Sequence, residues 1–244
     1  MRARRLVQLY SLLFATTLVL ASAHAPATRA TSHPLTAATP SLVALTPSAE
    51  VLLEHVKRAV VVVRSFDERG RLQASGTGFF VRPGQLVTNL HVVGRASRVE
   101  VLTFDGRAHA VAGLVALSEA RDLALLETGD ACRDVATLAV EPSVARAGEE
   151  IFVVGNPQGR AWTVSRGHTL SVWESQDVGA LVRISARLAR GSSGSPVVNM
   201  RGRVVGVATL SLRAGEESFF AVPSDEAARL RPANLRPFPL QLAD

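Results

Sequence analysis

The sequence predicts an all-β protein, either an antiparallel barrel or a sandwich. The first indication is a series of short apolar runs, several of them rich in β-branched residues. They lie at residues 60–63, 78–81, 86–88, 99–104, 108–117, 123–126, 151–154, 162–173, 180–185, 196–198, 204–210 and 219–222. The second indication is that Gly, Pro, Asp and Asn, the residues of tight turns, separate these runs. The third is that no strand–helix–strand rhythm interrupts them, which argues against a parallel sheet.

The N-terminal residues 1–25 have the composition of a secretory signal peptide. Residues 1–5 are basic, residues 6–20 are apolar, and Ala23 and Ala25 form a small-residue cleavage site. An uncleaved membrane anchor is the alternative, but the apolar segment is short for a complete span. We therefore expect export to the periplasm or the extracellular medium, with no stable membrane association after cleavage.

The rest of the chain divides into a linker and two halves of similar size. Residues 26–47, rich in Ala, Thr, Ser and Pro, have the composition of a flexible linker. Helical spacing over residues 51–56 predicts a short helix before the first strand. A break near Glu141 and Pro142 separates the two series of apolar runs. The expected parts of the folded chain are an N-terminal domain over 48–140, a C-terminal domain over 141–225 and a tail over 226–244.

Charge and cysteine content exclude several function classes. The chain of 244 residues carries a net charge of +6, and removal of residues 1–25, with three arginines and no acids, leaves +3. This charge is too small, and too little clustered with aromatic residues, to indicate a nucleic-acid partner. Cys132 is the only cysteine, so no intrachain disulfide can form and its thiol is expected to be structural. No Cys/His cluster has the spacing of metal ligands, and we expect neither a metal nor a cofactor.

The stretch GSSGSP at residues 191–196 is the most distinctive in the chain. Glycines on both sides of a serine let the backbone turn tightly and approach a ligand without interference from Cβ atoms. Such a turn exposes one hydroxyl and aims adjacent amide N–H groups at one point, as an oxyanion requires. A Gly/Ser-rich surface loop is the alternative interpretation. The apolar residues Val197 and Val198 that follow favour a turn anchored on a buried strand.

Two further residues supply what a serine hydroxyl needs for nucleophilic chemistry. His91 follows an apolar strand on a turn, and Asp122 immediately precedes another strand. A hydroxyl is a poor nucleophile until a neighbouring base takes its proton, and imidazole is the base available near neutral pH. A carboxylate fixes the imidazole tautomer and stabilises the imidazolium. Taken singly, such a His or Asp is more commonly structural, but the order His91, Asp122, Ser193 in an all-β chain predicts a catalytic triad.

In these residues the chain resembles the chymotrypsin-like serine peptidases, in particular the bacterial secreted HtrA/Deg-type and glutamyl-endopeptidase-like branches. The matching stretches are SGTGFFV at 75–81, VTNLHVV at 87–93, DLALL at 122–126, VVGNP at 153–157, GSSGSPVVN at 191–199, GRVVGV at 202–207 and FAVPS at 220–224. The resemblance implies two antiparallel six-stranded β-barrels with the active site in the cleft between them. Because only a short Pro-rich tail follows residue 225, the PDZ domain typical of HtrA proteins is not expected in this chain.

By position, the resemblance implies that His91 is the general base, Asp122 orients it and Ser193 is the nucleophile. The backbone N–H groups of Gly191 and Ser193 would form the oxyanion hole. Two positions depart from the family's usual Gly-Asn-Ser-Gly-Gly-Pro. Ser192 replaces an Asn or Asp that supports the loop, and Ser195 replaces the second glycine, as in glutamyl-endopeptidase-like members. An α/β-hydrolase is excluded, because its G-x-S-x-G elbow and its Ser–Asp–His order are both missing.

The expected function is that of a serine endopeptidase that cleaves unfolded or extended polypeptides through an acyl-enzyme on Ser193. The alternative is a catalytically inactive module of the same fold that binds peptides or acts like a chaperone. The intact triad favours the enzyme, and Ser192 is the one feature that favours the alternative.

The resemblance also implies where the primary specificity pocket lies. Val207 and Ala208, on the strand after the nucleophile loop, would form one wall, and Arg187 lies just before the loop. Glutamyl endopeptidases carry a histidine at the position of Ala208. No carboxylate is expected at the base of the pocket, so the pocket lacks an anchor for a Lys or Arg side chain of the substrate. Arg187 favours an acidic substrate side chain, with a solvent-facing arginine as the alternative interpretation. We expect a modest preference for small or medium apolar residues such as Val, Ala or Leu.

Overall fold

The computed structural model describes residues 47–142, 146–175, 179–209 and 218–240. The expected signal peptide over 1–25 and the expected linker up to residue 46 lie outside these described residues. In the described part of the chain, no helix is long and apolar enough to cross a membrane.

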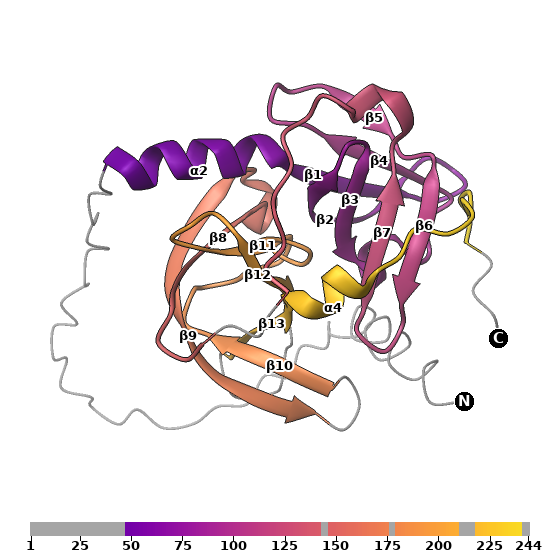
Figure 1. The fold of residues 1–244 in the computed structure, drawn as a ribbon. Coiled ribbons are helices and arrows are strands. Elements are labelled where there is room, and N and C mark those ends of the chain that lie inside the picture. The colour runs from indigo at the N-terminus through magenta and orange to yellow at the C-terminus, as the bar shows by residue number, and fades with distance from the viewer. Residues whose placement is uncertain (1–46, 143–145, 176–178, 210–217, 241–244) are drawn as a thin grey trace, which may run out of the picture. The chain divides into compact units, whose positions relative to one another are not determined.

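The described elements are nearly all strands (Figure 1). In chain order they are α2 (Pro47–Ala59), β1 (Val60–Phe66), β2 (Leu72–Arg82), β3 (Gln85–Asn89), α3 (Leu90–Val93), β4 (Arg98–Leu102), β5 (Ala108–Ala110), β6 (Gly113–Ser118), β7 (Leu123–Glu127), η1 (Gly129–Cys132), β8 (Glu150–Gly155), η2 (Pro157–Gly159), β9 (Thr163–Ser175), β10 (Gly179–Ile184), β11 (Pro196–Asn199), β12 (Val204–Thr209), β13 (Phe219–Pro223) and α4 (Ser224–Arg229).

The first seven strands form one antiparallel sheet with the order β5-β4-β1-β2-β3-β7-β6. Its concave side encloses a core that includes Val61, Val63, Phe80 and Leu126, all fully buried. The all-β class is therefore confirmed. The sheet differs from the expected six-stranded barrel because it has seven strands and curls into a half-barrel without closing.

The remaining six strands form a closed antiparallel barrel with the order β10-β13-β12-β11-β8-β9, as expected. Its core contains Ile151, Val153, Val197 and Val205. Strand β12 is buried along its whole length, because its apolar residues meet the barrel interior on one face and neighbouring segments on the other.

The two ends of the described chain each cross to the opposite β unit. Helix α2 leads into β1 of the sheet, yet Leu52 lies against Gly202 of the barrel, where a Cβ would come 2.5 Å from the leucine side chain. The C-terminal segment leaves the barrel through α4 and pairs with β6 of the sheet. Leu114 and Arg236 exchange two backbone hydrogen bonds of 2.8 Å, and Ala233 N donates to Val115 O. Of the expected tail over 226–244, residues 226–229 end α4, and residues 233–236 pair with the sheet.

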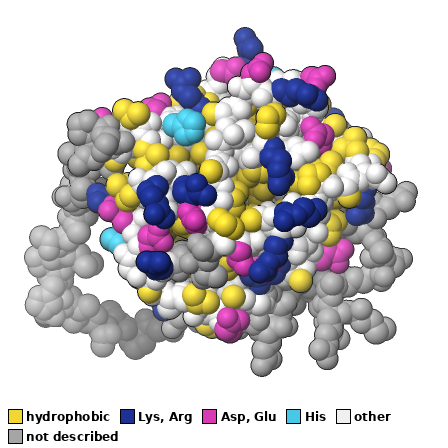
Figure 2. Space-filling view, in the orientation of Figure 1, with side chains coloured by type: hydrophobic (Ala, Val, Ile, Leu, Met, Phe, Trp, Pro, Cys, Tyr) yellow, Lys and Arg dark blue, Asp and Glu magenta, His cyan; other side chains and the backbone are white. Residues whose placement is uncertain are grey.

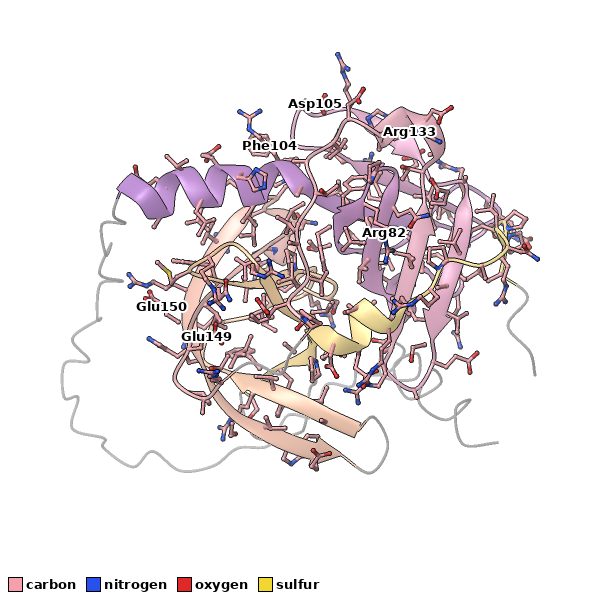
Figure 3. The ribbon with its side chains drawn as sticks, in the orientation of Figure 1. Arg82, Phe104, Asp105, Arg133, Glu149 and Glu150 are labelled. Atoms are coloured by element: carbon pink, nitrogen blue, oxygen red, sulfur yellow. The ribbon has the colours of Figure 1, made fainter. Side chains whose placement is uncertain are left out.

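Trp162 makes a further joint between the sheet and the barrel. Its indole Nε1 donates to Val60 O at 2.9 Å, and its ring meets Phe104 edge-on at a centroid distance of 5.3 Å. Phe104 lies beside the end of α2 (Figure 3), and Arg58 of that helix lies over its ring. Aromatic edge-to-face pairs add stabilisation beyond their buried area, so this joint helps to hold the two β units at a fixed orientation.

Charged side chains of both signs are spread over the surface in Figure 2, with acidic residues between the basic ones. Charged pairs among the described residues include Arg203 with Glu141 at 2.6 Å and Arg229 with Asp225 at 3.1 Å. Such exposed pairs contribute little to stability, typically about 0–1 kcal/mol.

Candidate active site

His91 lies on the single turn α3 at the end of β3. Leu90, Val92 and Val93 of this turn are buried in the sheet core, so His91 is the residue of α3 that remains partly exposed. The apolar neighbours fix the short turn by packing, and the imidazole is held at the rim of the sheet.

Asp122 occupies the tight turn between β6 and β7 in a left-handed conformation, with φ of 51°. Asp is among the few residues that tolerate this region. The turn is held because Asp122 O accepts hydrogen bonds from Leu90 N at 3.0 Å and Asn89 Nδ2 at 2.9 Å. The residues before His91 therefore fix the backbone of Asp122.

Both carboxylate oxygens of Asp122 contact His91, one at its backbone N–H and one at its imidazole ring. Oδ1 accepts from the His91 backbone N–H at 2.8 Å, and Oδ2 lies 2.5 Å from the ring Nδ1. A carboxylate acceptor favours the tautomer with the proton on Nδ1, which leaves Nε2 as the basic nitrogen. The side chains of His91 and Asp122 are 26% and 21% exposed, so the pair is partly shielded while remaining accessible to a substrate.

Ser193 lies in the loop before β11, between two glycines of positive φ, Gly191 at 93° and Gly194 at 84°. Ser193 is only 7% exposed. The loop packs closely against the sheet, because a Cβ on Gly194 would come 2.1 Å from Thr77 O and 3.2 Å from Asn89 N. The structure therefore brings the Ser193 loop against the end of β3, from which His91 follows directly.

Most backbone N–H groups of residues 191–195 donate a hydrogen bond within the protein, and two of them do not. Arg190 O accepts from Gln158 N at 2.6 Å, and Ser192 O accepts from Ser195 N at 3.0 Å. The N–H groups of Ser192 and Gly194 donate to Ala189 O and Ala208 O. Within the described residues, the N–H groups of Gly191 and Ser193 have no protein acceptor. Because the N–H and C=O of a trans peptide point in opposite directions, the Gly191 N–H points away from the 157–159 turn.

The two serines that depart from the family pattern are both buried. Ser192 Oγ accepts from Ala189 N at 3.1 Å, so its hydroxyl closes the turn before the nucleophile. Ser195 has no exposed surface, and its hydroxyl has no hydrogen-bond partner in the described structure. It fits because the facing residue is Gly155, where a Cβ would come 2.0 Å from Ser195 Oγ.

The residues expected to line the specificity pocket differ in burial. Val207 and Ala208 are fully buried, whereas Arg187 is exposed. Leu188, which the sequence reasoning did not single out, is 8% exposed and packs in the same core cluster as Ala208. Burial alternates from Ile184 to Leu188, and this strand-like alternation is the signal that identifies Leu188 as the inward-facing residue. Leu210, the last residue of the strand expected to form this pocket wall, lies outside the described residues.

Cys132 is buried in the sheet core. Burial raises the pKa of its thiol, because the charged thiolate is desolvated there. A thiol of this kind is a poor nucleophile. In the part of the chain that the structure describes, no group of three or more His, Cys, Asp or Glu side chains is placed to hold a metal ion.

Comparison with known proteins agrees with this geometry. Over 168 residues the chain is 34% identical to the probable periplasmic serine endoprotease DegP-like of Rhizobium meliloti, with 65% of this chain and 33% of that protein covered. It is 29% identical over 177 residues to the anti-sigma-I factor RsgI9 of Acetivibrio thermocellus, with 72% of this chain and 25% of that protein covered. This chain thus spans about a quarter to a third of the length of these two relatives.

Among solved structures, the fold is similar to that of a serine endoprotease from Yersinia pestis, with a TM-score of 0.66. The sequences are 24% identical, and the match covers 76% of this chain and 66% of the other. Residues 76–207, more than half of this chain and the span that carries His91, Asp122 and Ser193, match the trypsin-like peptidase domain. The chain therefore belongs to the trypsin-like peptidase family.

Proposed function

We propose that this chain is a serine endopeptidase in which Ser193, His91 and Asp122 form the catalytic triad. The observation that carries the proposal is the pair of backbone N–H groups, of Gly191 and Ser193, that have no protein acceptor within the described structure while the rest of their loop is bonded. Two unpaired donors beside a serine are what a tetrahedral oxyanion requires.

In the proposed reaction, the Ser193 Oγ attacks the carbonyl carbon of the peptide bond while its proton passes to His91 Nε2. The carbonyl oxygen becomes an oxyanion that accepts hydrogen bonds from the N–H groups of Gly191 and Ser193. When the carbon–nitrogen bond breaks, the imidazolium protonates the leaving amine and an ester on Ser193 remains. Water then attacks that ester with His91 as base, releasing the acid and restoring the serine.

Asp122 contributes to both halves of this reaction without exchanging a proton. Its Oδ2, 2.5 Å from Nδ1, keeps the imidazole in the tautomer whose Nε2 can accept the serine proton. The same carboxylate stabilises the positive charge that appears on His91 when the proton has moved.

A serine-directed fluorophosphonate probe tests the proposal. The purified protein should be labelled covalently, and Ser193→Ala should not be labelled while keeping the same circular dichroism spectrum. A well-folded wild type that takes up no probe would instead favour the alternative, a catalytically inactive module that binds peptides or acts like a chaperone.

We further propose that the substrates are unfolded or extended polypeptides outside the cytoplasm. The export pattern of residues 1–25 supports this, as does the similarity to a protein named as a periplasmic endoprotease. Fusion of residues 1–46 to a reporter that is active only after export tests it. The reporter should become active, and replacement of the basic residues 1–5 and the apolar run 6–20 by polar residues should abolish that activity.

For the cleaved position we propose a modest preference for small or medium apolar residues. Ala208 and Leu188 support this, since both are apolar and buried where the pocket is expected, while Arg187 is exposed. One methylene in such a pocket changes selectivity by about 1–3 kcal/mol. Mass-spectrometric mapping of cleavage sites in unfolded casein should show mainly Val, Ala and Leu before the cut. A dominant Glu or Asp there would instead make Arg187 a specificity residue.

A further inference from the structure

Thr77 of β2 connects the sheet to the Ser193 loop through its backbone and its side chain. The residue has no exposed surface. Its N–H donates to Ser193 O at 2.9 Å, and its carbonyl accepts from Thr88 Oγ1 at 2.7 Å. Its hydroxyl donates to Gly191 O at 2.7 Å and accepts from Asn156 N at 3.0 Å. One residue of the sheet thus bonds to both residues whose N–H groups form the proposed oxyanion hole.

The hydroxyl fixes the two peptide groups on either side of Gly191. It holds the Gly191 carbonyl directly. It also holds Asn156, which begins the turn whose Gln158 N donates to Arg190 O at 2.6 Å. The Thr77 hydroxyl therefore holds Gly191 O directly, and it supports the hydrogen bond to Arg190 O indirectly, through Asn156.

Gly191 needs such a restraint more than another residue would. It adopts a φ of 93°, and glycine moves between positive and negative φ at little cost in free energy. The Gly191 N–H belongs to the same peptide group as Arg190 O, so the Thr77 hydroxyl restrains this N–H through Asn156 and the hydrogen bond from Gln158 N to Arg190 O. The hydroxyl fixes the next peptide group, which leads to Ser193, directly through Gly191 O. Larger side chains are excluded here, because a Cβ on Gly191 would come 2.2 Å from Asn156 O.

We propose that Thr77 is a positioning residue for the oxyanion hole, acting through its hydroxyl from the opposite β unit. The inference rests on the proposed peptidase function. Thr77 contacts no reacting atom in this scheme, and its effect passes through Gly191. Formation of the hole therefore depends on correct docking of the sheet against the barrel.

The experiment compares Thr77→Val, which removes the hydroxyl at nearly constant volume, with Thr77→Ser, which retains it. Thr128→Val is the matched control, because Thr128 is another buried threonine of the sheet whose hydroxyl donates to a glycine carbonyl, Gly84 O at 2.9 Å. Loss of one oxyanion donor lowers kcat by about 10²–10³-fold. We expect Thr77→Val to lower kcat by about that factor at nearly unchanged KM, and Thr77→Ser and Thr128→Val to stay close to wild type. Equal kcat values for Thr77→Val and Thr128→Val would overturn the inference.

A second readout does not depend on activity and separates failure of this inference from failure of the proposed function. In ¹H–¹⁵N spectra of the folded protein, Thr77→Val should shift or broaden the amide signals of Gly191 and Ser193, whereas Thr77→Ser and Thr128→Val should not. Unchanged signals in Thr77→Val would overturn the inference even in an active enzyme. Altered signals would support it even if the wild type took up no fluorophosphonate. If the valine variant does not fold, Thr77→Ala, which also lacks the hydroxyl, replaces it in both measurements.

Discussion

At the scale of single residues, Ser193 and His91 act as one unit in the proposed chemistry, so the loss of either should remove nearly the whole rate enhancement. We expect Ser193→Ala and His91→Ala each to lower kcat by about 10⁶-fold, as in other serine peptidases. Asp122→Asn should lower it by about 10⁴-fold, because an amide at this position favours the wrong tautomer of His91. Steady-state kinetics on a peptide substrate, with thermal unfolding to confirm folding, checks these values.

Ser195→Ala is the control for the assignment of the nucleophile, since it removes another buried hydroxyl of the same loop. The Ser195 hydroxyl has no hydrogen-bond partner in the described structure, so its removal leaves no new unpaired group. The variant should keep most of its kcat and a Tm equal to or above that of wild type. A loss as large as that of Ser193→Ala would show that the nucleophile is not Ser193.

The buried thiol of Cys132 should make the folded state less stable at alkaline pH. Burial raises the pKa of this thiol in the folded protein above its value in the unfolded chain. The protonated thiol therefore contributes its full stabilisation of the folded state below the pKa that Cys132 has in the unfolded chain. This stabilisation is lost as pH rises through the higher pKa of the folded state, because the unfolded chain releases the thiol proton at lower pH than the folded protein does. Urea unfolding across alkaline pH should show a decline in stability that is smaller in Cys132→Ala. Equal declines in the two proteins would refute this.

At the scale of elements, Arg121 joins the turn that carries Asp122 to two parts of the C-terminal half. Its Nη2 donates to Ala180 O of β10 at 2.6 Å, and its Nε lies 3.4 Å from Glu226 of α4. The Arg121 side chain is 10% exposed, so its loss removes a shielded hydrogen bond to Ala180 O and an ion pair with the partly buried Glu226. We expect Arg121→Met to lower the free energy of unfolding by about 1–3 kcal/mol and to reduce kcat, as the turn holding Asp122 loosens.

Arg133→Met is the matched control for this prediction. Arg133 pairs with Asp130 at 2.5 Å, but its side chain is 67% exposed, and exposed pairs are worth about 0–1 kcal/mol. Urea unfolding and kcat measurements should therefore separate the two variants. If both change stability by the same small amount, Arg121 is not a joint between the halves.

The elements that sequence predicted best are those with local signals. The valine run at the start of β1 and the glycines around Ser193 carry their own conformational preferences, so strands and the nucleophile turn could be placed from the pattern. Pairing across the sheet has no such signal. The seventh strand and the attachment of residues 233–236 to β6 depend on contacts far apart in sequence, and a Pro-rich segment without alternation gives no indication of them.

The candidate site shows the same division. The types and order of His91, Asp122 and Ser193 could be read from motifs, because the chemistry restricts which residues serve. The left-handed φ of Asp122 could not, because hydrogen bonds from Asn89 and Leu90, distant in sequence, hold that turn. The bonds of Thr77 to the loop could not either, because they form only when the two β units meet. The inward direction of Leu188 follows from the alternation of apolar and polar residues over 184–188, which also places Arg187 on the outward side.

At the scale of the whole molecule, the C-terminal segment should contribute measurably to stability. Beyond α4 it makes three backbone hydrogen bonds to Leu114 and Val115, and Phe238 and Leu240 pack against the sheet core. We expect removal of residues 231–244 to lower the free energy of unfolding by about 3 kcal/mol or more, at about 1 kcal/mol per bond. For a domain of this size that corresponds to a fall in Tm of about 6–12 °C in calorimetry.

A point variant tests the same attachment in the full chain. A Cβ at Gly113 would come 2.4 Å from Arg236 O, so Gly113→Ala should displace the segment and reproduce most of the effect. A Tm within 1–2 °C of wild type for both variants, less than about 1 kcal/mol, would mean that the segment is not a structural part of the sheet.

The pairing of residues 233–236 with β6 also sets an order of events for a chain that emerges from its N-terminus. The sheet that holds His91 and Asp122 gains the strand partner of its β6 edge only after the chain has been made past residue 236, well beyond Ser193. In the proposed peptidase, the scaffold that carries His91 and Asp122 would therefore be completed only after the Ser193 loop has been made.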